Sequence, residues 1–270
     1  MIDHNIRFIL SHFSGQEFLF PRSIMTYETK GQIFVDSEDQ MIKYFSDANL
    51  VDCRVNGYPF HHADEQKKLY PSFIFIDLDL SLCFTCKYPI RKLDYILKQI
   101  LKKIKEEING YPTVLWTGGG YHIYQPIKIV TKDNEKQPLE TIKEFTEFIS
   151  VVRNDLTTEF IRFAEKYLAN NKGDPKHNPS IYSCLIRIPE TINSKSNQEV
   201  KIIQKWNGIE AIANPILLPF LDHLIQIKLE TEELRKKDLY TNSINSVKIS
   251  WIDKLLETPI PDHRYYCLWH

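Results

Sequence analysis

The spacing of apolar and polar residues predicts a domain that mixes β-strands with amphipathic helices. Residues 73–76 form a short, uncharged and apolar run that follows Pro71 and leads into two aspartates. Such a run is typical of a central strand that is buried on both faces. Apolar residues then recur at helical spacing, which predicts a long helix that begins near Pro89 and ends at Gly110. Spacing alone therefore favours an α/β or an α+β domain.

Other segments carry shorter patterns of the same two kinds. Residues 113–116 and 121–125 are typical of two strands of a hairpin, joined by a glycine-rich turn. Ser37 and Gln40 form a capping box at the start of a helix that runs to residue 49. The remaining expected elements are strands over residues 31–36, 181–188 and 200–204, helices over residues 139–168, 215–237 and 247–256, and a linker over residues 240–245.

Composition narrows the class of protein. Of the 270 residues 43% are hydrophobic, yet no apolar run is long enough to span a bilayer. The N-terminal residues lack the pattern of a secretory signal, and five cysteines at irregular spacing argue against a disulfide framework. The net charge of −1 indicates that any contact with nucleic acid comes from local patches. We therefore expect a cytoplasmic globular protein without a membrane partner.

Two acidic residues at the end of the central strand are the first candidates for chemistry. Asp77 and Asp79 are separated by one residue, so they point to the same face, about 7 Å apart. Carboxylates this close repel each other unless a cation lies between them, and Mg²⁺ and Mn²⁺ prefer such oxygen ligands. Taken alone, the pair is also compatible with a solvated strand end. The residues downstream favour the metal site.

The glycine turn of the hairpin is the second candidate. Gly118, Gly119 and Gly120 allow another group to approach the backbone closely, and successive amides in such a turn can cradle an anion. Thr117 precedes the glycines, and His122 follows them on the next strand. Glycine turns are common, but a histidine directly beyond one is less so. The segment is therefore a candidate phosphate site.

The third candidate region lies farther along the chain. A polar loop contains Asp174, and the strand after it leads into a segment with Arg187, Asn193 and Lys195. Three carboxylates, a glycine cradle with a histidine, and separate basic residues suit two-metal phosphoryl transfer. In that chemistry the carboxylates hold the metals, and the basic groups neutralise a triphosphate. The three regions together predict a nucleotide-processing site.

These motifs, in this order, resemble those of the archaeo-eukaryotic primase superfamily, in its primase-polymerase branch. IFIDLD matches the family motif hhhDhD, and TGGGYHIY matches a motif of a small residue, glycine and histidine. SCLIRIPETINSK matches a strand that ends in R-h-P-G-[ST]-h-N-x-K. The resemblance covers about residues 70–210. It implies an α+β fold, in which an N-terminal α/β module and a module like an RNA-recognition motif surround a shared cleft.

The resemblance also implies a role for each motif residue. Asp77, Asp79 and Asp174 would be catalytic and would bind Mg²⁺ or Mn²⁺. The residues that would hold the nucleotide are Thr117, Gly118, Gly119, Gly120, His122, Arg187, Asn193 and Lys195. The implied activity is that of a DNA primase or DNA-directed polymerase, with single-stranded DNA template, primer and NTP or dNTP as partners. A replicative helicase or another replication protein is a further partner that the family suggests.

Three features depart from the family pattern or fall short of it. Glu190 stands where the family has glycine, which adds an acid near the nucleotide and changes the loop. Asp174 is assigned by order and distance, and Asp155, inside a helical pattern, is the weaker competitor. A zinc site is not favoured, because Cys83 and Cys86 have the spacing of half a site and no second pair follows at matching spacing.

The chain is expected to hold its catalytic core in residues 1–225. Residues 226–270 are expected to form a helical linker and the start of a further helical domain. The final sequence LLETPIPDHRYYCLWH resembles the opening of the helical domain in archaeal members of the family, which suggests that the chain stops inside that domain.

Two functions without catalysis stay open. A silent primase-like subunit would bind nucleotide and template, but such proteins usually lose one or more carboxylates, which are retained here. A structural module would stack bases on exposed sheet aromatics such as Phe73 and Phe75. In so apolar a strand these two residues are expected in the core, so catalysis is the leading hypothesis.

Overall fold

The computed structural model describes residues 2–14, 19–60, 69–83, 87–130, 135–136 and 138–257. The chain divides into two compact units, Met1–Asp222 and His223–His270. The first unit contains both of the larger β-sheets. Among the described residues, no helix is both long and apolar enough to cross a membrane.

A four-stranded antiparallel sheet is built mainly from the N-terminal part of the chain. Its strand order is β2-β1-β3-β7. The strands are β1 (Arg22–Met25), β2 (Ile33–Val35), β3 (Arg54–Asn56) and β7 (Leu185–Arg187), and the helices of this region are α1 (Ile2–Ser11) and α2 (Glu38–Asp47). Ser37 caps α2 by accepting a hydrogen bond from the Gln40 amide, as predicted. β7 brings Arg187 to this sheet from far along the chain.

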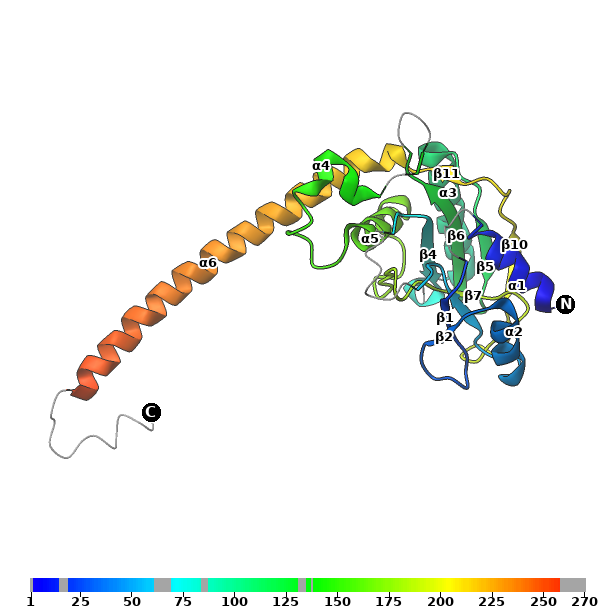
Figure 1. Ribbon diagram of the computed structural model, residues 1–270, viewed down its shortest axis with the longest axis horizontal. Helices are drawn as coiled ribbons and strands as arrows, with labels where there is room; N and C mark the ends of the chain where they lie inside the picture. Colours follow the sequence, from blue (N-terminus) through cyan, green and yellow to red (C-terminus); the bar gives the residue numbers. More distant parts are fainter. Residues whose placement is uncertain are drawn as a thin grey trace. The chain divides into compact units, whose positions relative to one another are not determined.

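The second sheet contains the predicted central strand. Its members are β4 (Phe73–Asp79), β5 (Thr113–Trp116), β6 (Gly120–Lys128), β10 (Lys201–Gln204) and β11 (Ala211–Ile212). β6 pairs with both β4 and β5, and Figure 1 shows these three strands as neighbours. In this register Asp77 lies opposite His122, and Asp79 lies opposite Gly120. The pairing therefore brings the first two predicted motifs side by side.

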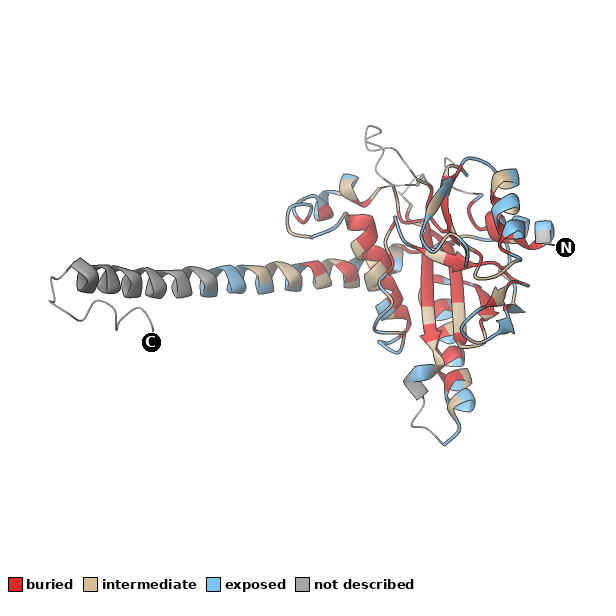
Figure 2. Cartoon of the chain, turned by 90° about the horizontal axis from the view of Figure 1, so that it is seen from below, coloured by how far each residue is buried: buried red, intermediate tan, exposed pale blue. Residues whose placement is uncertain are grey.

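The second sheet lies in the core of the fold because its strands contain many buried apolar residues. Phe73, Ile74, Phe75, Ile76 and Leu78 of β4 are at most 5% exposed. Most of the sheet has the colour of buried residues in Figure 2. β4 contacts helix α5 (Leu156–Leu168), which contributes its own buried residues to the core.

Helix α3 (Pro89–Ile108) covers the face of the sheet opposite to His122. It begins at Pro89, as predicted, and its last residue is Ile108. The C-cap is Asn109, whose φ of 52° is left-handed, rather than the predicted Gly110. Asp94 of α3 accepts a hydrogen bond from the Tyr121 hydroxyl, 2.7 Å away. Because Tyr121 and His122 alternate along β6, the face that carries His122 is left for the site.

The remaining elements complete the fold. They are the 3₁₀ helices η1 (Leu80–Cys83), η2 (Leu139–Thr141) and η3 (Asn214–Ile216), helix α4 (Lys143–Thr146), strands β8 (Ile192–Asn193) and β9 (Gln198–Glu199), and the long helix α6 (Leu217–Glu257). The named strand pairs are antiparallel except β6 with β11. The fold is therefore of the α+β class, as predicted.

Two segments differ from the prediction. The strand expected over residues 181–188 is reduced to β7, because residues 181–183 form a turn. The Asn56 side chain holds that turn: its amide donates to the Ile181 carbonyl (2.9 Å), and its oxygen accepts the Cys184 amide (3.1 Å). The linker expected over residues 240–245 is helical within α6, since that segment contains neither glycine nor proline to end a helix. Cys86, one of the pair considered for zinc, and residues 258–270 lie outside the described residues.

Candidate active site

A cavity of about 490 Å³ is lined by residues from both sheets and from the loops around them. It brings together the three regions that the sequence singled out. The predicted site residues that line it are Asp77, Asp79, Thr117, Gly119, Gly120, His122, Asp174, Arg187, Asn193 and Lys195. Gly118 does not line the cavity. Neither does Asp155, which instead caps α5 by accepting a hydrogen bond from the Thr158 amide, 2.7 Å away.

The acidic residues are positioned largely by backbone hydrogen bonds. The Asp174 amide donates to the Asp77 carbonyl (2.8 Å), and the Asp77 amide donates to the Glu165 carboxylate of α5 (3.3 Å). Both bonds lie along the edge of β4 that does not pair with β6. The Asp79 carboxylate accepts the Ser81 amide at 2.6 Å. The loop with Asp174 is therefore docked against the strand that carries the other two carboxylates.

The electrostatics of this end of the cavity favour a cation. Burial raises the pKa of Asp77 to about 7; Asp174, Glu165 and Asp79 add to the rise, and His177 opposes it. The ionised form of Asp77 therefore lacks sufficient compensation from the protein. Within the described ranges, no three His, Cys, Asp or Glu side chains form a ready metal site.

The three glycines of the turn serve three different purposes. Gly118 has a φ of +82°, and a Cβ there would lie 2.3 Å from Ser196 Oγ, so it faces the segment after β8 rather than the cavity. At Gly120 a Cβ would lie 1.9 Å from the Leu78 carbonyl, so glycine allows β6 to approach β4. At Gly119 a Cβ would meet no atom within 4 Å. Gly119 is therefore the glycine that leaves open space for a ligand.

The His122 side chain is 12% exposed, and it is neutral. Burial, together with the nearby Arg187, holds the pKa of His122 well below its usual range. Its Nδ1 lies 2.9 Å from the Tyr124 hydroxyl, whose oxygen accepts the Arg187 amide at 2.8 Å. Burial raises the pKa of Tyr124, so the hydroxyl keeps its proton and can donate it to Nδ1. The proton of neutral His122 then resides on Nε2, which lies 3.6 Å from the Asp77 carboxylate.

We expect Tyr124→Phe to lower both stability and activity. The change removes the acceptor of the buried Arg187 amide, which costs about 1–3 kcal/mol of unfolding free energy. It also frees His122 to change tautomer, so nucleotide incorporation should fall about tenfold or more. Chemical denaturation and an incorporation assay measure the two effects. Tyr95→Phe, at an exposed position of α3, is the matched control, and equal effects of the two changes would contradict this role.

Arg187 links the third motif to the glycine turn. It is 5% exposed, and its guanidinium donates to the Asp52 carboxylate (2.8 Å) and to the Asn193 side-chain oxygen (3.2 Å). The Asn193 amide in turn donates to the Thr117 carbonyl at 2.7 Å. Burial disfavours the charged form of Asp52, but hydrogen bonds from Ser194 and Arg187 outweigh it and lower its pKa. The ionised Asp52 therefore fixes the position of Arg187.

The sequence did not single out several residues of this site. His177 lines the cavity, packs edge-on against Phe75 with ring centroids 4.3 Å apart, and lies 2.6 Å from the Glu165 carboxylate. Burial lowers the pKa of His177, but Glu165 outweighs it and the net shift is upward. Tyr124 was detectable, because it lies two residues beyond His122 on the same strand face. Asp52 and Glu165 carry no sequence signal, since only the fold brings them to the site.

Glu190, which stands where the resembled motif has glycine, has a backbone conformation that suits glycine. Glu190 has a φ of +61°, a left-handed conformation that glycine adopts without strain. Its amide donates to the Val200 carbonyl at 2.8 Å. The side chain is exposed and does not line the cavity, so the acid that we expected near the nucleotide points elsewhere.

Glu190→Gly should therefore raise the unfolding free energy, by about 1 kcal/mol, because it relieves the left-handed strain. Glu190→Ala removes the same charge but keeps the strain, so it should give no gain. Urea denaturation of the three proteins distinguishes the two causes. An equal gain from alanine and glycine would show that charge, rather than backbone conformation, is responsible.

No protein-family model matches the chain, and no curated protein matches it by sequence. Two solved structures are similar in fold. One is the catalytic domain of the primase RepB′ in complex with initiator DNA, with 14% identity, coverage of 87% of this chain and 97% of that chain, and a TM-score of 0.45. The other is the AEP domain of the primase-polymerase (PrimPol) of cyanophage S-2L, with 12% identity, coverage of 79% and 96%, and a TM-score of 0.43. At these scores the likeness carries no conclusion about what the chain does.

Proposed function

We propose that this protein is a DNA-template-dependent nucleotidyltransferase that makes or extends primers. The observation that supports this function best is the composition of one cavity. Three carboxylates, an open glycine turn, a neutral histidine and the basic residues Arg187 and Lys195 line it together. Transfer of a nucleotide needs this combination, because acids must hold cations while amides and basic groups hold a triphosphate.

The acidic end fits a hard divalent cation. Asp77 is only partly compensated by the protein, and carboxylate oxygens are the ligands that Mg²⁺ and Mn²⁺ prefer. Mg²⁺ characteristically takes one or two carboxylates and completes its shell with phosphates and water. Asp77, Asp79 and Asp174 would hold the ions. Bound ions would stabilise the charge on the attacking and leaving oxygens.

The other end of the cavity would hold the triphosphate. His122 offers an Nε2 proton to an anion, and Asn193 and Arg187 are fixed relative to the glycine turn by their mutual hydrogen bonds. Lys195 is exposed at the cavity, where it can close on a phosphate. With the triphosphate so held, the primer 3′-oxygen would attack the α-phosphorus, and pyrophosphate would leave with the electron pair of the broken bond.

We also propose a division of the chain and a set of partners that agree with this function. Residues 1–225 would form the catalytic core, and the described residues after them, 226–257, would form a helical linker. Single-stranded DNA template, primer and NTP or dNTP would be the partners. A replicative helicase would be a further partner.

The test is nucleotide incorporation on single-stranded DNA, with and without a primer, in Mg²⁺ or Mn²⁺. We expect incorporation that requires the template and stops on addition of EDTA. Parallel reactions with NTP and dNTP establish which sugar is used. Folded protein that binds template and nucleotide but forms no product under any of these conditions would contradict catalysis and favour the silent subunit.

A further inference from the structure

Two arginines face each other across strands β3 and β7. Arg54 and Arg187 are direct partners in the antiparallel register, so their side chains leave the sheet on the same face. Both line the cavity. Like charges directly opposite each other on neighbouring strands destabilise a sheet. The pair therefore needs a negative charge beside it.

Asp52 supplies that charge unequally. Its carboxylate lies 2.8 Å from the Arg187 guanidinium but 3.9 Å from that of Arg54, which is too long for a hydrogen bond. The Ser194 hydroxyl donates to the other carboxylate oxygen. Asp52 is therefore largely committed to Arg187 and Ser194, and Arg54 has only a distant ionic contact with it.

Arg54 also has an unsatisfied donor. Its Nε is buried and makes no hydrogen bond within the described part of the chain. The Arg54 side chain is 26% exposed, and it reaches solvent at the cavity. Burial and the nearby Arg187 both lower the pKa of Arg54, but an arginine keeps its proton in proteins. A guanidinium with a spare donor, beside a second cation, is a site for an anion that can accept two hydrogen bonds.

We propose that Arg54 binds a phosphate of the incoming nucleoside triphosphate, so that the N-terminal sheet forms part of the nucleotide site. This inference rests on the proposed function. The triphosphate is the favoured anion because Arg187, the neighbour of Arg54, is connected through Asn193 to the glycine turn. A phosphate beside Arg54 would then lie in the same cavity as that turn and Lys195.

The experiment measures ligand binding rather than turnover. Wild type, Arg54→Met and Arg54→Gln are titrated with inorganic triphosphate and, separately, with a single-stranded DNA oligonucleotide, by calorimetry or fluorescence. Arg153→Met, at an exposed arginine that does not line the cavity, is the matched control for the loss of one positive charge. Circular dichroism and the melting temperature of each free protein are recorded in parallel.

We expect both Arg54 variants to bind triphosphate about tenfold more weakly or worse, and the control to bind it like wild type. DNA affinity should change no more than in the control. The melting temperature of the free variants should stay the same or rise, because the repulsion between Arg54 and Arg187 is removed. A structural arginine would show the opposite, a lower melting temperature with unchanged triphosphate binding.

Three results would overturn the inference. Equal triphosphate binding by wild type and both variants would remove Arg54 from the nucleotide site and leave the proposed function intact. Weaker binding of the oligonucleotide alone would assign Arg54 to a phosphate of the DNA strand. No binding of triphosphate by wild type would overturn the proposed function together with the inference.

Discussion

Asp174→Asn should reduce nucleotide incorporation by at least about a hundredfold, whereas Asp155→Asn should leave it near the wild-type rate. Asp174 lines the same cavity as Asp77 and Asp79, and its amide is bonded to the Asp77 carbonyl. Asparagine keeps that backbone bond and can still accept the Lys176 amide, which Asp174 Oδ1 accepts at 3.0 Å. The change therefore removes charge without removing the contacts that position the loop.

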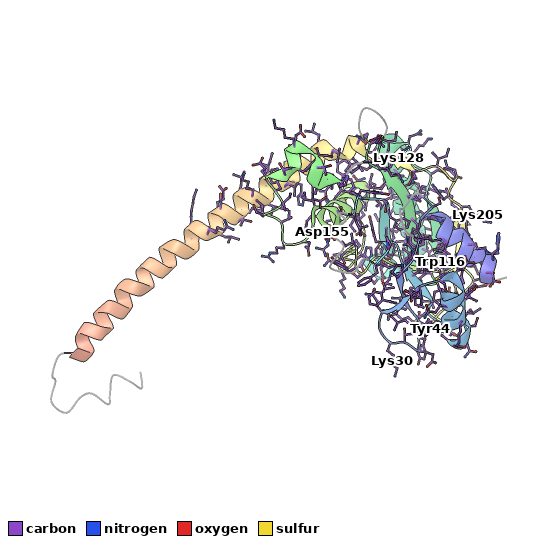
Figure 3. The ribbon with its side chains drawn as sticks, viewed as in Figure 1. Lys30, Tyr44, Trp116, Lys128, Asp155 and Lys205 are labelled. Atoms are coloured by element: carbon purple, nitrogen blue, oxygen red, sulfur yellow. The ribbon has the colours of Figure 1, made fainter. Side chains whose placement is uncertain are left out.

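Asp155→Asn is the matched control because it is the same substitution at the competing position. Asp155 caps α5, and asparagine is an equally good cap. In Figure 3 it lies at the start of α5, apart from the labelled Trp116 that precedes the glycine turn. Incorporation lost in Asp155→Asn and retained in Asp174→Asn would reverse the assignment of the third carboxylate.

Asp77→Asn should make the metal-free protein more stable at alkaline pH than wild type. Burial and neighbouring acids raise the pKa of Asp77 from 3.8 to about 7, so the folded protein favours the protonated form. The stability that this carboxyl contributes is present below its unfolded pKa and is lost as pH rises towards about 7. Asparagine does not titrate. The advantage of the variant should therefore grow between pH 5 and pH 8, by up to about 3 kcal/mol.

The measurement is urea denaturation of both proteins in EDTA at pH 5 and pH 8. The unfolding free energy of the variant is compared with that of wild type at each pH, because other titrating groups change stability with pH in the opposite direction. Burial lowers the pKa of His12 to about 4, so that residue costs stability as pH falls from its ordinary value of 6.5. Added Mg²⁺ should stabilise wild type at pH 8 more than it stabilises the variant. A difference that is the same at both pH values would contradict the electrostatic description of the site.

Local sequence patterns were sufficient to predict the strands and the helix in the region of the first two motifs. The apolar run of β4, the hairpin of β5 and β6 and the long helix α3 each follow from short-range spacing, and the structure contains all three. The pairing of β4 with β6 could not be read from spacing alone. The resemblance implied that Asp77 and His122 serve one site, but it did not specify that their strands are paired.

Long-range contacts explain what the sequence did not predict. The first half of the strand expected after residue 180 is a turn because Asn56, far away in the chain, supplies its hydrogen bonds. Asp52 and Arg54 belong to the site because β3 pairs with β7, and no motif marks either residue. The left-handed backbone of Glu190, at the position where the resembled motif has glycine, could also not be predicted from local spacing. Residues that position the motif side chains, or that join them at the site without a motif of their own, are thus harder to predict from sequence than the motif residues themselves.

The most direct test of the central claim compares wild type with Asp77→Asn/Asp79→Asn in primer extension on single-stranded DNA, in Mg²⁺ or Mn²⁺. Both proteins are first shown to be folded by circular dichroism and to bind the template. Extension by wild type that is lost in the double variant is the expected result, and it would establish that the carboxylates of β4 carry out nucleotidyl transfer. Equal extension by both proteins would contradict the proposed site.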